Sequence, residues 1–216
     1  MAAVVMVGIL GIAAGAQGAL AQGAVVHQRP SYFIPFEELP ADAATAIAIL
    51  ENRLFTIAPE SAEERDIQYL LRLARLYLRP DQPPGRQETV SHTLRVNAWW
   101  YARYVVPRRR VILADFQGIL STYWAGRGFA VNPVATAGRW QGLNDALTPE
   151  ALAGELLPLG VGRRHGLRRF LLWEYYDVPD QPGVIRPGAS GMAQGRIAQL
   201  MAVSYTHLTL PTIYSV

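Results

Sequence analysis

The spacing of apolar residues predicts three consecutive helices in the first half of the chain. Asp42 can cap a helix over residues 43–57 whose apolar side chains share one face: Ala43, Ile47, Leu50, Leu54 and Ile57. Ser61 and Glu64 form a capping box for a second helix, which Pro80 ends. A third helix is expected over about residues 88–106. Because the loops between them are short, the three helices are expected to pack side by side as helical hairpins.

The pattern changes after Pro107. Short β-branched runs lie on either side of residues 115–118, which predicts a β-hairpin inserted among the helices. Thr148 followed by Pro149 is a strong signal for a helix start. The stretch FLLWEYYD is expected to be a strand or extended segment, and a last helix is expected from about Ser190.

The two ends of the chain differ from the rest. Residues 1–21 are an uncharged apolar run with alanines spaced as at a signal-peptidase site, so we expect a secretory signal peptide. No Lys or Arg precedes the run, which leaves an N-terminal anchor as the alternative. Residues 203–216 contain no Arg, Ala or Gly, and their back-translation resembles a sequencing adaptor. We interpret them as adaptor-derived, with the natural protein continuing past about Met201; the alternative is a genuine polar terminus.

Composition and spacing argue against several kinds of chemistry. Half of the residues are hydrophobic, as in globular proteins, and the net charge of +3 permits an acidic partner without requiring one. The chain has no cysteine, and its histidines are isolated from other ligand types, so we expect no metal site and no cofactor. The arginine groups at 108–110 and 163–169 lack interleaved aromatic residues. They predict a solvated face and no nucleic-acid partner.

The stretch PGASGMAQGRIAQLMA, residues 187–202, resembles the S-[AG]-M-A-Q-G helix start of the D-glucuronyl C5-epimerase C-terminal domain family. The resemblance extends upstream through residues 123–147 and 173–177, and covers about residues 110–201. It implies a mainly α fold over residues 30–201: an incomplete (α/α) toroid of helical hairpins with a small inserted β-hairpin. It also implies a carbohydrate groove that acts on glucuronic acid residues, with Gly191 and Gly195 allowing close helix approach.

The implied chemistry suggests candidate site residues. Inverting C5 of a uronate needs a base on one face, an acid on the other, and positive charge beside the carboxylate. Arg139 and Arg186 are the candidates for that charge. The other substrate-binding candidates are Asn132, Asn144, Glu174, Tyr175, Ser190 and Gln194. For each of them a purely structural role is the alternative, such as a helix cap at Ser190. The family's proton-transfer residues lie downstream of the motif, so no catalytic residue is assigned.

The expected protein is therefore secreted or periplasmic and bacterial, and it acts on or binds a uronic-acid-containing polysaccharide by C5 proton abstraction and re-protonation. As a fragment, it is expected to be inactive. Two alternatives stay open, a non-catalytic glycan-binding envelope protein and a uronate polysaccharide lyase, whose β-elimination begins with the same proton abstraction. Contact with a membrane is expected only if residues 1–21 stay uncleaved.

Overall fold

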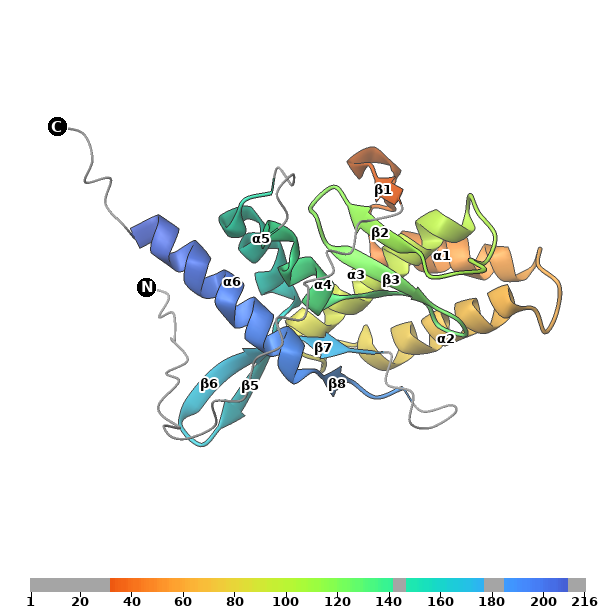
Figure 1. The fold of residues 1–216 in the computed structure, drawn as a ribbon. Coiled ribbons are helices and arrows are strands. Elements are labelled where there is room, and N and C mark those ends of the chain that lie inside the picture. The colour runs from red at the N-terminus through yellow and green to blue at the C-terminus, as the bar shows by residue number, and fades with distance from the viewer. Residues whose placement is uncertain (1–31, 142–146, 177–184, 210–216) are drawn as a thin grey trace, which may run out of the picture.

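The computed structural model describes residues 32–141, 147–176 and 185–209 (Figure 1). Its helices are α1 (Ala43–Leu54), α2 (Ala62–Tyr77), α3 (Pro84–Tyr101), α4 (Pro133–Ala137), α5 (Pro149–Leu156) and α6 (Gly191–Thr209). Its strands are β1 (Tyr32–Ile34), β2 (Ile112–Asp115), β3 (Leu120–Trp124), β4 (Gly128–Val131), β5 (Val161–His165), β6 (Arg168–Leu172), β7 (Glu174–Tyr175) and β8 (Gly188–Ala189). Three short 3-10 helices complete it: η1 (Phe36–Glu38), η2 (Arg139–Gln141) and η3 (Leu157–Leu159).

The first two helices begin where capping residues predict. The Asp42 carboxylate accepts a hydrogen bond from the Thr45 amide at 2.7 Å, and the Ser61 hydroxyl accepts one from the Glu64 amide at 3.1 Å. The predicted starts of α1 and α2 are thus confirmed. α3 starts earlier than the predicted residue 88, because a proline in the first turn needs no hydrogen-bond partner for its nitrogen.

The prediction of a mainly α, incomplete (α/α) toroid is wrong. A four-stranded mixed sheet in the order β1-β2-β3-β4 packs against the helices, and two further two-stranded sheets follow. The predicted hairpin is present as β2 and β3, but β4 extends it by a third antiparallel strand. β1 pairs with β2 in parallel, with Phe33 opposite Ala114. This parallel partner lies about 80 residues upstream, so no local pattern indicated it.

Two large apolar cores stabilise the fold, beside a small third cluster of Ile112, Ala114 and Leu120. The first lies between α1, α2, α3 and one face of the sheet, and its fully buried members include Leu50, Ile67, Leu94, Leu113 and Phe129. The second joins α4, α5 and α6, where Leu152, Leu156, Ile197 and Leu200 pack together. Trp173 closes this second core and donates its indole N–H to the Leu156 carbonyl at 2.7 Å.

The chain between α5 and α6 contains a hairpin that periodicity did not predict. β5 and β6 pair in register from Val161 opposite Leu172 to His165 opposite Arg168. The turn depends on Gly166, whose φ of +58° is unfavourable for other residues. The stretch FLLWEYYD contributes to both β6 and β7, so its predicted extended conformation is confirmed.

The last helix starts as expected, directly after Ser190. α6 continues to Thr209 and so includes the first residues of the 203–216 stretch, whose interpretation as adaptor-derived stays a prediction. Within the described ranges, no helix combines the length and the apolar composition that crossing a membrane would require. Residues 1–21 lie outside the described residues, and the signal peptide also stays a prediction.

Candidate functional site

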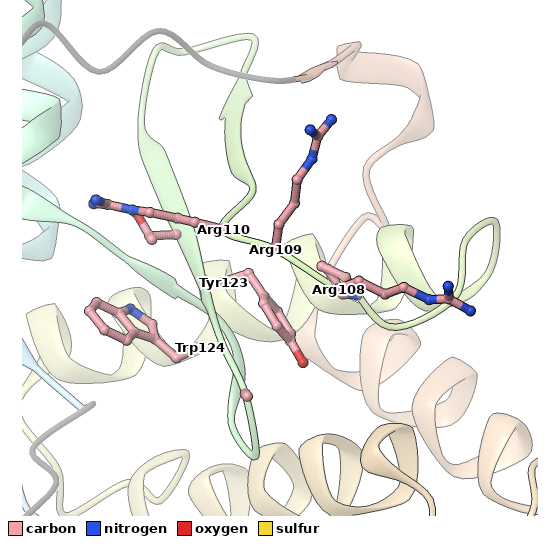
Figure 2. Close-up of a pocket in the computed structure, with 8 residues that line it drawn as sticks. Arg108, Arg109, Arg110, Tyr123 and Trp124 are labelled. Carbon is pink, nitrogen blue, oxygen red and sulfur yellow. The ribbon is translucent and has the colours of Figure 1, made fainter.

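A pocket of about 370 Å³ opens beside the end of β3 (Figure 2). Two segments form it: residues 107–110, which lead from α3 into β2, and residues 122–125, at the end of β3. The Tyr123 amide donates to the Val111 carbonyl at 3.0 Å, which holds the two segments together. The lining residues are Pro107, Arg108, Arg109, Arg110, Thr122, Tyr123, Trp124 and Ala125.

The pocket combines positive charge with an accessible aromatic ring. The three arginines are exposed, and no described carboxylate forms an ion pair with Arg108 or Arg109. Trp124 is 44 % exposed although it is a large apolar residue. In Figure 2 the three guanidinium groups spread in different directions, and that of Arg110 lies on the same side as the Trp124 ring. Guanidinium groups bind carboxylates through paired N–H donors, so the lining suits an anionic ligand with an apolar face.

Tyr123 belongs both to the pocket wall and to a buried polar cluster behind it. Its hydroxyl donates to the Asp66 carboxylate at 2.9 Å, and the Tyr101 hydroxyl donates to the same oxygen at 2.6 Å. Burial raises the pKa of Asp66, and the two hydroxyl hydrogen bonds oppose that rise. Burial and the nearby Asp66 charge raise the pKa of Tyr123 well above its ordinary value. At neutral pH the Tyr123 phenol is therefore a fixed donor that positions its ring and does not act as a base.

The sequence pattern contained an overlooked signal for this pocket. The arginine group at 108–110 predicts a solvated face, because no aromatic residue interleaves with it along the chain. The observed register places Ile112 opposite Thr122 in antiparallel strands. Residues just before Ile112 therefore lie across from residues just after Thr122, which are Tyr123 and Trp124. The register of the hairpin therefore brings the arginines and the aromatic residues together.

Glu174, a predicted substrate-binding residue, lies in a buried ion-pair network. Arg86 of α3 donates to both Glu174 carboxylate oxygens, each at 2.9 Å, and Arg163 of β5 donates to one of them. The Tyr176 hydroxyl donates to the other at 2.9 Å. Burial alone would raise the pKa of Glu174, but the hydrogen bonds from Arg86, Tyr176 and Arg163 and the charge of Arg86 hold it below its usual range. These protein partners occupy the carboxylate and link α3, β5 and β7.

Two predicted residues, Asn132 and Tyr175, meet at the start of α4. The Asn132 side chain caps this helix by accepting from the Ala135 amide at 3.0 Å, and it donates to the Thr122 hydroxyl at 3.1 Å. The Tyr175 hydroxyl accepts from the Val134 amide at 3.3 Å. Both side chains thus hold α4 against its neighbours.

The remaining predicted residues lie in separate places. Buried Arg139 donates to the Gly118 carbonyl at 2.9 Å, whereas Arg186 is exposed. The Ser190 hydroxyl accepts from the Ala193 amide at 3.4 Å, at the start of α6. Gln194 accepts from the Trp173 amide at 3.2 Å and donates to the Trp173 carbonyl at 2.8 Å. Asn144 lies outside the described residues, and none of the predicted site residues lines the pocket of Figure 2.

Gly191 and Gly195 of the 187–202 motif have open surroundings. A Cβ atom placed on Gly191 or on Gly195 would meet no atom within 4 Å. The close helix approach that the resemblance implied at these positions is therefore wrong. A glycine that does allow close contact is Gly85, where a Cβ atom would lie 2.0 Å from the Gly160 carbonyl oxygen. Close backbone approach in this fold thus occurs between α3 and the segment before β5.

His92 and Asp115 form a further pair of buried polar side chains, which lies between α3 and β2. The His92 Nδ1 atom is 3.7 Å from an Asp115 carboxylate oxygen, and both side chains are almost fully buried. The His92 Nε2 atom has no hydrogen-bond partner among the described residues. Burial lowers the pKa of His92, and the Asp115 charge opposes this only in part. The imidazole is therefore neutral in the folded chain near neutral pH.

Replacing His92 by glutamine is expected to weaken the dependence of stability on acid pH. Below the unfolded pKa of 6.5, the unfolded chain takes up a proton at His92 that the folded chain does not. Protonation of His92 therefore leaves the free energy of unfolding unchanged above that pH. Below it, the free energy of unfolding falls by at most about 1.4 kcal/mol per pH unit. Urea unfolding of both proteins at about pH 7, 6 and 5 measures the difference. Parallel pH profiles for the two proteins would contradict it.

Comparisons with known proteins identify no relative. The chain matches no protein-family model, and neither a curated protein nor a solved structure is significantly similar to it. The resemblance to the C5-epimerase domain therefore stays a prediction based on the quoted motif. Across the described residues, no three His, Asp or Glu side chains converge in a way that would hold a metal ion.

Proposed function

We propose that this protein binds an acidic polysaccharide, through uronic acid residues, in the pocket between residues 107–110 and 122–125. The observation that carries the proposal is the joint lining of one surface pocket by three exposed arginines and the accessible ring of Trp124. The proposal includes the secreted or periplasmic location that residues 1–21 predict.

The chemistry of a uronic acid residue matches both features of this lining. Its carboxylate takes paired N–H donors from a guanidinium group, which stays charged at any physiological pH. Its pyranose ring has an apolar C–H face that can cover an aromatic ring and exclude water from it. Because successive uronates repeat along a polymer, the separate arginines can bind neighbouring carboxylates. The binding is expected to weaken as salt screens these exposed charges.

The pocket supports binding better than it supports epimerisation or β-elimination. Both reactions begin with removal of the C5 proton by a base. Of the eight lining residues, only the arginines and Tyr123 carry ionisable groups. Arginine stays protonated, and the Tyr123 phenol has a raised pKa and donates to Asp66. We therefore favour a glycan-binding role for the described residues.

Substitutions in the pocket are expected to weaken binding to a polyglucuronate. Trp124→Ala removes the aromatic surface and should raise the dissociation constant about tenfold, as for a central aromatic contact. Arg108→Gln with Arg109→Gln should raise it up to about thirtyfold at low salt, since each exposed charge pair contributes at most about 1 kcal/mol. Titration of labelled polyglucuronate with each variant of the 216-residue chain measures both effects.

Matched controls separate the pocket from general surface effects. Phe55→Ala removes another exposed aromatic ring, at the end of α1 and away from the pocket, and should leave binding unchanged. A carboxyl-reduced form of the same polymer should bind weakly to every variant, because its charge is gone. Equal binding of the two polymers, or equal loss with Phe55→Ala and Trp124→Ala, would overturn the proposal.

Incubation with polyglucuronate in deuterated water is expected to give no deuterium at C5 above a protein-free blank. This result follows from the lack of a base in the pocket lining. Mass spectrometry of the hydrolysed polymer measures the exchange, and absorbance of an unsaturated product would detect β-elimination. Either signal, if lost in Trp124→Ala, would assign catalysis to the pocket in place of binding alone.

A further inference from the structure

The hairpin of β5 and β6 forms a basic projection at the edge of the molecule, with its turn directed away from the first three helices (Figure 1). Residues 161–172 contain four arginines and one histidine but no carboxylate. Arg163, near the base, is paired with buried Glu174. The other three arginines, Arg164, Arg168 and Arg169, are exposed.

Strand register concentrates these charges near the turn. Arg164 lies directly opposite Arg169, and His165 lies directly opposite Arg168. Like charges at facing positions of an antiparallel pair, here those of Arg164 and Arg169, destabilise it. An external anionic surface would relieve this repulsion near the turn. At the other end of the hairpin, the charge of Arg163 is already neutralised by Glu174.

Apolar side chains are exposed among the same arginines. Leu167, in the turn itself, is 93 % exposed, and Phe170 and Leu171 of β6 are also exposed. Because it is so exposed, Leu167 buries almost no apolar surface against the rest of the protein. An exposed apolar group between basic residues is typical of a surface that lies at a lipid interface, where the apolar group enters the headgroup region and the basic groups contact phosphates.

We propose that this hairpin binds the surface of an anionic phospholipid bilayer. Arg164, Arg168 and Arg169 contact lipid phosphates and carboxylates, and Leu167 enters the boundary between headgroups and acyl chains. A polysaccharide fits this surface less well, because its most exposed apolar side chain is an aliphatic residue at a convex tip. The proposal uses no residue of the pocket at 107–110 and 122–125, so it is independent of the glycan-binding proposal.

Co-sedimentation with lipid vesicles tests the proposal. The full chain is mixed with vesicles of phosphatidylcholine containing about 30 % phosphatidylserine, and with vesicles of phosphatidylcholine alone. Each basic residue near an anionic bilayer strengthens partitioning about fivefold, so Arg164→Gln with Arg169→Gln should lower it about 25-fold. Leu167→Ser should lower it roughly tenfold through loss of apolar burial. Every variant keeps residues 1–21, so any contribution from that apolar run is the same throughout.

The same co-sedimentation assay provides a control variant and the outcomes that would contradict the proposal. Arg72→Gln with Arg75→Gln removes two exposed charges from α2 and should leave partitioning within about twofold of the wild type. Trp124→Ala should also leave it unchanged, whatever its effect on polyglucuronate. Equal partitioning to both vesicle types, or equal loss in the hairpin and α2 variants, would overturn the proposal. Loss of polyglucuronate binding in the hairpin variants, with vesicle binding retained, would overturn it in favour of a glycan surface.

Discussion

Replacing Glu174 by alanine is expected to lower the free energy of unfolding by about 3–5 kcal/mol, because it leaves buried positive charge without its partner. The Glu174 side chain is 2 % exposed, and that of Arg86, which donates two hydrogen bonds to it, is 12 % exposed. Arg163 and the Tyr176 hydroxyl lose their acceptor at the same time. A small domain is stable by about 5–15 kcal/mol in total, so this single change removes a large part of it.

Urea denaturation followed by far-UV circular dichroism measures this loss. Glu51→Ala removes an exposed glutamate from α1 and should change stability by no more than about 0.5 kcal/mol. Since the pKa of Glu174 is lowered on folding, its stabilisation is complete above its unfolded pKa of 4.5 and is lost as the pH falls through the lower folded pKa. Equal denaturation midpoints for the two variants would contradict a stabilising role for the network.

Local signals predicted the helices well and the sheets poorly. Asp42, Ser61 and Thr148 each cap the helix that follows them, because capping depends only on residues three positions apart. Strand pairing depends on partner strands that can lie far away in the sequence, and a local pattern does not identify them. β1 was hidden in a proline-flanked stretch, and its partner β2 begins 80 residues later. β1 makes the four-stranded sheet mixed, because it is the strand that pairs in parallel, and β4 completes that sheet.

The candidate site also depends on contacts between residues that are distant in the sequence. The polar residues gathered around one loop predict Glu174, Ser190 and Gln194 as site residues, but these side chains bind an ion-pair partner or backbone groups of the protein. A gathering of polar residues in sequence does not reveal whether protein groups already satisfy them. The arginines at 108–110 are exposed, as a solvated face would be, but Tyr123 and Trp124 lie beside them across the hairpin. Because these arginines and aromatic residues are separated along the chain, a local pattern does not show that they lie together.

Replacing Asn97 by leucine is expected to lower the free energy of unfolding by about 3–5 kcal/mol, since each buried backbone group left without a partner costs about 1–3 kcal/mol. The fully buried Asn97 amide donates to the Phe129 carbonyl at 2.7 Å and accepts from the Phe129 amide at 2.8 Å. It therefore bonds β4 as a neighbouring strand would, and closes the open edge of the sheet against α3. Gly128, with φ of +76°, allows this approach: a Cβ atom there would lie 2.3 Å from the Asn97 side-chain oxygen.

Two measurements separate loss of this edge contact from a general change in apolar volume. Asn52→Leu makes the same change at an exposed position of α1 and should leave the urea midpoint nearly unchanged. Amide hydrogen exchange should lose protection at Phe129 in the Asn97 variant, because water replaces the missing acceptor. Retained protection at Phe129 would show that β4 finds another partner. The joining of α3 to the sheet would then depend on apolar contacts alone, in which Phe129 packs against Trp100 and Tyr123.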